Sequence, residues 1–241
     1  MKRLLAVLVA ALALPASVSG GTPITVFAAA SLTEVLPRID KSPRYSFAGS
    51  DQLAIQIQQG APADVFAAAS PKQPELLFRG GLVRKPVVFA TNRLIVLVPR
   101  SNPAHIRSVY DVRRDGVKIV IGDRTVPIGT YTRQILDALG ITADVTRNVV
   151  SEETDVKGIV TKVALGEADA GFVYRTDAKT VASRTHSVAL PAWAQPAIRY
   201  EVAVVKASSR PQAAAAFVKR LRSMQGRLAL KQAGFGLPGP P

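Results

Sequence analysis

The chain has 241 residues, of which 48% are hydrophobic and 20% are charged, the balance of an ordinary globular protein with one large domain or two small ones. Its 31 Lys and Arg residues exceed its 17 Asp and Glu residues, giving a formal net charge of +14 and an electrostatic field that attracts anions. The absence of cysteine from the sequence excludes a disulfide scaffold, a thiolate metal site, a cysteine nucleophile and a lipid anchor on cysteine.

Residues 1–20 have the features of a secretory signal peptide. Lys2 and Arg3 form a short positive region, residues 4–14 are apolar without interruption, and small residues follow Pro15. This order predicts a signal that is cleaved after export, because the apolar run is well short of the roughly 20 residues that span a bilayer. We therefore expect a periplasmic protein with no membrane insertion once the signal is removed.

After residue 20, short runs of β-branched residues alternate with amphipathic stretches, a pattern that predicts an α/β fold. In the first part of the chain the expected strands are residues 24–27, 45–47, 65–68 and 94–98, and the expected helices are residues 31–39, 51–59 and 71–79. In the second part the expected strands are residues 118–121, 145–150, 170–174, 187–190 and 200–205, and the expected helices are residues 130–139, 155–165 and those from 211 onward.

Two of these strands, residues 94–98 and 200–205, separate two series of βα units. They predict two lobes joined by two crossing strands, with each lobe a mostly parallel sheet flanked by helices. The predicted first lobe is residues 21–93 plus 203–241, and the predicted second lobe is residues 94–202, so that the C-terminal helices return to the first lobe. A cleft between two lobes is a natural place for a ligand.

Catalytic signatures are weak in this sequence. Gly234, Gly236 and Gly239 have the spacing of a dinucleotide-binding turn, but that turn needs a strand before it and a helix after it, so the interpretation is a loose C-terminus. His105 and His186 are the only histidines, and both lie in polar stretches. We therefore expect no enzyme, no catalytic residue and no cofactor; a secreted hydrolase is the weakest alternative.

Strand ends followed by helix starts recur along the chain, and such places bind anions through backbone N–H groups. One begins at Ser31, which with Glu34 also fits a capping box; taken alone, Ser31 is better explained as a helix cap than as a ligand residue. Pro127 suits a first helical turn that leaves neighbouring N–H groups free, and Asp155 suits a cap. The four predicted helix starts, divided between the lobes, favour one shared anion site; they lie at Ser31, Ser50, Ile128 and Val156.

Several segments, in order along the chain, resemble the periplasmic molybdate-binding proteins of ABC importers. The longest are residues 24–32 (ITVFAAASL), 58–66 (QQGAPADVF) and 166–174 (GEADAGFVY), and shorter ones are residues 47–50 (FAGS) and 121–129 (IGDRTVPIG). The resemblance covers nearly the whole chain after the signal. It implies a two-lobed type II periplasmic binding protein that is monomeric and delivers its ligand to a membrane permease driven by a cytoplasmic ATPase.

The resemblance also implies the ligand and the site. The ligand is molybdate, with tungstate as a further ligand, and molybdenum is held as the oxyanion, without a side chain bound to the metal. Ser31 and Ser50 contribute hydroxyl and backbone N–H groups, Ile128 and Val156 contribute backbone N–H groups, and Tyr174 contributes its phenol. A fully deprotonated dianion presents only acceptors, so a site made of donors suits it, whereas hydrogen phosphate also needs an acceptor.

Three departures from the pattern of this family keep other ligands open. Ile128 stands where a smaller residue is usual, Asp51 follows Ser50 where a hydroxyl residue is usual, and the stretch from residue 31 to residue 47 is short. Another tetrahedral oxyanion such as sulfate is therefore the first alternative. The alternative from a different class is a basic protein that binds nucleic acid or another polyanion, although the Lys and Arg residues are scattered without interleaved aromatic residues.

Overall fold

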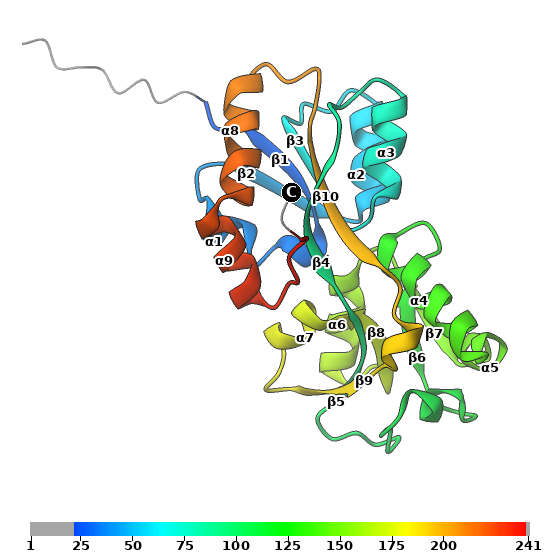
Figure 1. Ribbon diagram of the computed structural model, residues 1–241. Coiled ribbons are helices and arrows are strands. Elements are labelled where there is room, and N and C mark those ends of the chain that lie inside the picture. Colours follow the sequence, from blue (N-terminus) through cyan, green and yellow to red (C-terminus); the bar gives the residue numbers. More distant parts are fainter. Residues whose placement is uncertain (1–21, 240–241) are drawn as a thin grey trace, which may run out of the picture.

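The computed structural model describes residues 22–239, so the predicted signal peptide lies outside the described residues. Two five-stranded sheets form two lobes, one above the other in Figure 1, and each sheet is flanked by helices. Within residues 22–239, no helix combines the length and the apolar character that a membrane span requires.

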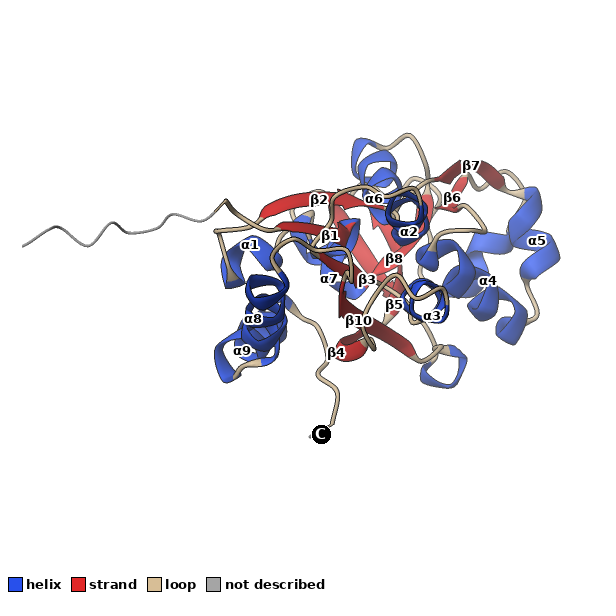
Figure 2. Ribbon diagram, turned by 90° about the horizontal axis from the view of Figure 1, so that it is seen from above, coloured by secondary structure: helices blue, strands red, loops and turns tan. Residues whose placement is uncertain are grey.

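The first sheet has the strand order β2-β1-β3-β10-β4. Its strands are β1 (Thr25–Ala29), β2 (Arg44–Ala48), β3 (Val65–Ala68), β4 (Val87–Asn92) and β10 (Ile198–Val204). Two helices cover one face, α2 (Ser50–Gln58) and α3 (Lys72–Arg79). Figure 2 shows the other three together on the opposite side: α1 (Leu36–Ile39), α8 (Pro211–Arg222) and α9 (Met224–Ala233). As expected, the C-terminal helices return to the first lobe.

The second sheet has the strand order β7-β6-β8-β5-β9. Its strands are β5 (Leu94–Pro99), β6 (Ile119–Gly122), β7 (Val149–Glu153), β8 (Ala170–Tyr174) and β9 (Thr185–Ala189). The flanking helices are α4 (Pro127–Leu139), α5 (Thr142–Arg147), α6 (Val156–Leu165) and α7 (Arg175–Thr180). Strands β6 and β8 are buried along their whole length, which is typical of strands covered by helices on both faces.

Both sheets are mixed. In the first, β1 pairs in parallel with β2 and β3, whereas β10 pairs antiparallel with β3 and β4. In the second, β6 pairs in parallel with β7 and β8, whereas β5 pairs antiparallel with β8 and β9. The expectation of mostly parallel sheets thus holds for the strands that βα units connect, and the two long crossing strands run in the opposite direction.

The chain passes between the lobes in two places. The first passage is very short, because β4 ends at Asn92 in the first sheet and β5 begins at Leu94 in the second. The return runs through residues 190–197, which include a 3-10 turn (Ala192–Ala194), and enters β10. Strand β10 spans residues 198–204, so it extends across the predicted boundary between residues 202 and 203. The assignment of residues to the two lobes therefore stays a prediction.

Strands 65–68 and 170–174 have the predicted bounds, but two other expectations are wrong. The helix expected over residues 31–39 is a 3-10 turn (Ala30–Leu32) followed by the four-residue α1, which has proline in its first turn. Proline lacks the N–H group that would continue an earlier helix, so a new helix starts there. The strand expected over residues 145–150 is divided between α5 and β7.

The C-terminal segment is also more ordered than expected. Gly234 ends α9 with a left-handed backbone conformation, φ 100°, which glycine adopts without strain. Gly236 then exchanges two backbone hydrogen bonds with Thr91 of β4, and Phe235 is buried with its ring edge against Tyr200. The interpretation of a loose end is therefore wrong as far as residue 236, because this segment packs on the strands that join the lobes.

Candidate functional site

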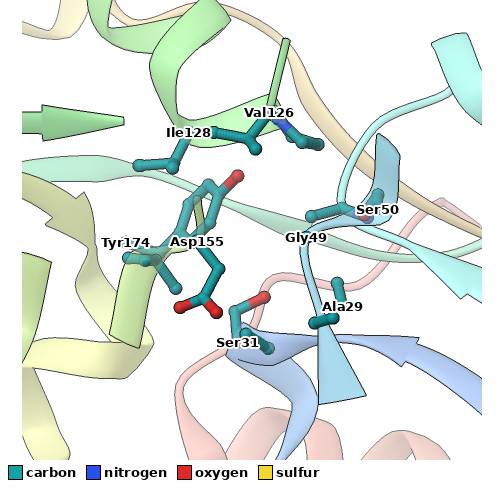
Figure 3. Close-up of a pocket in the computed structure, with 13 residues that line it drawn as sticks. Ala29, Ser31, Gly49, Ser50, Val126, Ile128, Asp155 and Tyr174 are labelled. Carbon is teal, nitrogen blue, oxygen red and sulfur yellow. The ribbon is translucent and has the colours of Figure 1, made fainter. Parts of the chain in front are cut away.

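A small cavity lies between the lobes, where strands of both sheets end and helices begin (Figure 3). Its volume is about 20 Å³, and a single ordered water needs roughly 10–15 Å³. A space of this size suits a small ligand such as an inorganic ion. The structure brings all five predicted site residues to its wall: Ser31, Ser50, Ile128, Val156 and Tyr174.

The first lobe contributes small residues at the carboxyl ends of neighbouring strands. Strands β1, β2 and β3 end at Ala29, Ala48 and Ala68, and Ala29, Ala48 and the following Ala69 line the cavity. Because parallel strands end at the same edge of a sheet, the segments that follow them converge there. Methyl side chains leave the backbone at this edge accessible to a small ligand.

Two helices begin at the cavity without a side-chain cap. Helix α2 follows Gly49 and α4 follows Val126, and neither of these residues accepts a hydrogen bond with its side chain. The first backbone bonds within the helices come from Leu53 and Thr130, so the N–H groups before them have no partner in the helix. Pro127 occupies the first turn of α4, as predicted. The N–H groups of Ser50 and Ile128 are therefore free to donate.

The start of α6 differs, because Asp155 caps it. One carboxylate oxygen of Asp155 accepts from the N–H groups of Lys157 and Gly158, at 2.7 and 3.3 Å. Because Asp155 uses the N–H groups of Lys157 and Gly158, the Val156 N–H group in the first turn of α6 is left to bind a ligand. The cap was predicted, but its carboxylate also lines the cavity. The expectation that the site contains only donors is thus wrong in this respect.

Ser31 is held by a residue that sequence reasoning missed. The predicted capping box is absent, since the turn at residues 30–32 has no side-chain cap. Instead, the Ser31 hydroxyl lies 2.9 Å from the phenol oxygen of Tyr200 in β10, a residue that is fully buried. The only sequence signal for Tyr200 was its place at the start of a predicted crossing strand, because the two residues are 169 positions apart.

Ser50 is held by the backbone. Its hydroxyl oxygen accepts a hydrogen bond of 3.1 Å from the N–H group of Ala69, the residue that follows β3. An accepting hydroxyl keeps its own proton to donate elsewhere. Ser50 is buried and lines the cavity, so this proton is available to a ligand there.

Tyr174 ends β8 with a buried phenol that has no hydrogen-bond partner among the described residues. Burial raises the pKa of this phenol well above its ordinary value, so the hydroxyl stays protonated and can act as a donor. Leaving a buried polar group unpaired costs about 1–3 kcal/mol. A ligand oxygen in the cavity would satisfy the group.

The positive charge of the site comes from the backbone, and the Asp155 carboxylate opposes it with a negative charge on the cavity wall. Among the described residues that line the cavity, none is Lys or Arg; the positive ends of α2, α4 and α6 face it instead, each equivalent to about half a charge. Beyond the cavity wall, buried Asp177 lies 3.2 Å from the ammonium group of Lys157. Burial raises the pKa of Asp177 to about 6, and Lys157 opposes that shift.

Contacts around the cavity join the two lobes. Asp51 does not line the cavity: one of its carboxylate oxygens lies 2.9 Å from the Thr125 hydroxyl, in the loop before α4, which shares its one proton between Asp51 and an Asp123 oxygen 2.7 Å away. The Arg175 guanidinium, in the second lobe, donates to the Gly234 carbonyl of the first lobe at 2.9 Å. At Gly49, an added Cβ would lie 2.5 Å from the Thr154 carbonyl oxygen of the other lobe. The lobes are therefore closed on each other.

Comparison with known proteins supports this picture. Residues 24–236 match the family described as bacterial extracellular solute-binding protein. The molybdate-binding protein ModA of Mycobacterium tuberculosis is 40% identical, with 91% of this chain and 86% of that protein covered. ModA of Escherichia coli is 31% identical, with 88% of each covered.

Solved structures share the fold. The periplasmic molybdate-binding protein of Azotobacter vinelandii matches with a TM-score of 0.81 at 23% identity, over 90% of this chain and 100% of that chain. The sulfate-binding protein SubI of Mycobacterium tuberculosis matches with a TM-score of 0.80 at 18% identity, over 91% and 88%. The predicted two-lobed fold and the family resemblance are confirmed: this chain belongs to the bacterial extracellular solute-binding proteins, in the family of the ModA proteins.

Proposed function

We propose that this protein captures molybdate in the periplasm and delivers it, as a non-enzymatic monomeric receptor, to the permease of an ABC importer. One observation carries the proposal. Donors from both lobes face one small cavity, and one of them, the buried hydroxyl of Tyr174, has no partner among residues 22–239. The molybdate-binding names of the relatives support the choice of ligand.

The donors fit a tetrahedral dianion. Ser31 and Ser50 offer hydroxyls, Ile128 and Val156 offer backbone N–H groups, and Tyr174 offers its phenol. Each hydrogen bond to a charged acceptor contributes roughly 1.5–3 kcal/mol, and the helix ends add favourable charge without a buried lysine or arginine. Tungstate, with the same shape and charge, is bound by the same groups.

Binding and closure are coupled in this proposal. The serine hydroxyls of Ser31 and Ser50 belong to the first lobe. The Tyr174 phenol and the backbone N–H groups of Ile128 and Val156 belong to the second. An anion therefore satisfies all of them only when the lobes are together, and it stabilises the closed state. The proposed lobes, residues 21–93 plus 203–241 and residues 94–202, would rotate about the junctions at Arg93 and residues 190–197.

Calorimetric titration of the anion-free protein with molybdate, tungstate, sulfate and phosphate, in separate runs, tests the proposal. We expect one-to-one binding of molybdate and tungstate, weaker binding of sulfate and the weakest of phosphate. A protein that binds sulfate and leaves molybdate unbound overturns the choice of ligand. A duplex DNA oligonucleotide tests the polyanion alternative, for which only weak and steeply salt-dependent binding is expected.

Sulfate remains the second candidate because of one side chain. Ile128 is 2% exposed and lines the cavity. Its bulk narrows the space for a ligand and so favours sulfate, which is smaller than molybdate. Replacing it with alanine enlarges the cavity and keeps the backbone N–H group. The variant Ile128→Ala is expected to raise the ratio of molybdate affinity to sulfate affinity, and an unchanged ratio means that Ile128 does not set the size limit.

A further inference from the structure

We propose, on the basis of the function proposed above, that Asn92 and Tyr200 form a hydrogen-bond relay that points the Ser31 proton into the cavity and thereby selects fully deprotonated anions. Both are positioning residues, because they act on the ligand through Ser31. Neither belongs to the set of ligand donors described above.

The direction of the relay starts at Asn92, the last residue of β4. Its amide oxygen accepts a 2.9 Å hydrogen bond from the N–H group of Arg93, which fixes the orientation of the amide. The amide nitrogen of Asn92 then lies on the side away from Arg93. It donates one hydrogen to the Thr176 hydroxyl, at 2.9 Å, and the other to the Tyr200 phenol oxygen, at 3.4 Å. The Tyr200 oxygen is therefore an acceptor towards Asn92.

The relay continues from Tyr200 to Ser31. Since the phenol has one proton and its oxygen already accepts from Asn92, the proton is directed to the Ser31 oxygen 2.9 Å away. Burial raises the pKa of Tyr200 well above its ordinary value, so the proton is retained. Ser31 thus accepts from Tyr200, and its own proton is left to donate into the cavity that it lines.

The Tyr200 ring is fixed in place by aromatic neighbours. The rings of Phe89, Tyr174 and Phe235 meet it edge-to-face, with centroids 6.1, 5.8 and 5.4 Å away. The phenol therefore cannot swing away from Ser31 without disturbing this packing. Replacement by phenylalanine removes only the hydroxyl and keeps the ring contacts. The variant Tyr200→Phe therefore tests the hydrogen bonds of the relay separately from the packing of the ring.

The relay makes Ser31 equivalent to Ser50, which accepts from the N–H group of Ala69. Both serines of the first lobe are supplied with an internal donor, and both must then donate to the ligand. An anion that carries a proton needs an acceptor, and neither hydroxyl can act as one, which leaves the Asp155 carboxylate as the side-chain acceptor on the cavity wall. By withholding Ser31 as a further acceptor, the relay favours molybdate over hydrogen phosphate.

The test is a double-mutant cycle with Tyr200→Phe, Ser31→Ala and the double variant, each titrated with molybdate and with hydrogen phosphate at pH 8. Tyr200→Phe is expected to weaken molybdate binding roughly tenfold, the size of one hydrogen bond, and to leave hydrogen phosphate binding unchanged or stronger. In the Ser31→Ala background, Tyr200→Phe is expected to have little further effect, because coupled residues are not additive.

Tyr45→Phe is the matched control, since the Tyr45 hydroxyl donates to the Leu36 and Asp40 carbonyl oxygens, within the first lobe and outside the cavity wall. It is expected to leave both affinities unchanged. Equal weakening of both anions by Tyr200→Phe, or the same loss with and without Ser31, overturns the relay. Failure of the unmutated protein to bind molybdate is a separate result, and it overturns the proposed function instead.

Discussion

The two lobes supply the same cavity with different kinds of donor. In the first lobe, Ser31 and Ser50 offer side-chain hydroxyls, which other groups must orient. In the second lobe, Ile128 and Val156 offer backbone N–H groups, whose direction is set by the start of a helix. The first lobe is therefore sensitive to its side chains, whereas the second depends mainly on the path of its backbone, with Tyr174 as the side-chain donor on its part of the cavity wall. Five predictions test this difference.

The largest effect is expected from Gly129→Ala in the second lobe. A Cβ at this position would lie 1.8 Å from the Asp123 carbonyl oxygen and 2.4 Å from that of Gly122, so the start of α4 must move away from β6. We expect loss of about 1–3 kcal/mol in the free energy of unfolding and loss of measurable molybdate binding, by denaturant titration and calorimetry. Gly80→Ala is the control, because its Cβ has room; similar behaviour of the two variants contradicts the prediction.

The counterpart in the first lobe is the pair Ser31→Ala and Ser50→Ala. Each removes one hydroxyl donor to a charged ligand, and we expect molybdate affinity to fall about tenfold to a hundredfold. Each variant also leaves a buried donor without its acceptor, the Ala69 N–H group for Ser50→Ala and the Tyr200 phenol for Ser31→Ala, so both are expected to lower the unfolding free energy by about 1 kcal/mol. Calorimetry and thermal unfolding measure the two effects, and a variant with unchanged stability would show that the bond it removes is unimportant.

Tyr174→Phe tests the side-chain donor of the second lobe. Its buried phenol lacks a partner among the described residues, so removing the hydroxyl is expected to stabilise the ligand-free protein by about 1 kcal/mol while molybdate binding weakens about tenfold. Thermal unfolding with and without molybdate separates the two effects. Tyr110→Phe, at an exposed position, should change neither; a destabilised ligand-free Tyr174→Phe protein would mean that the phenol is already satisfied.

Gly49→Ala tests the contact between the lobes without removing a donor. The added methyl group would meet the Thr154 carbonyl oxygen of the other lobe at 2.5 Å and a carboxylate oxygen of Asp51 at 2.7 Å. The Asp51 side chain can rotate away, whereas the Thr154 carbonyl is part of the backbone, so the main effect is to hinder closure. We expect roughly tenfold weaker molybdate binding and little change in the unfolding of the ligand-free protein. Small-angle scattering should show incomplete compaction on ligand addition, and compaction equal to that of the unmutated protein would refute this account.

The smallest effect concerns Asp177, whose pKa is raised to about 6 by burial. The unfolded chain keeps the ordinary value of about 3.8, so between these values the folded protein holds a proton that the unfolded chain lacks, and stability falls as pH rises. Relative to Asp177→Asn, the unmutated protein should gain about 1 kcal/mol between pH 7 and pH 5. Paired denaturant titrations measure this difference. A constant difference would mean that Lys157 keeps the carboxyl ionised throughout.

Local patterns were enough for much of the site. Strand 170–174 and the start of α4 at Pro127 follow from a run of apolar residues and from the stereochemistry of proline. These features depend on neighbours in the chain. Strand β4 and helix α7 were not predicted, and the strand expected at residues 145–150 was partly wrong, because short apolar runs do not distinguish strand from buried helix.

Sequence alone determined most of the strand ends and helix starts around the cavity, though not a helix start at Ser31, and the family pattern pointed to five residues as donors. Only the tertiary structure decided how these groups are oriented. The bonds from Tyr200 to Ser31 and from Thr125 to Asp51 join residues 169 and 74 positions apart, and no local preference specifies such pairs. Helix starts are set by dihedral angles and caps within a few residues, whereas the direction of a hydroxyl proton depends on whichever donors folding brings beside it.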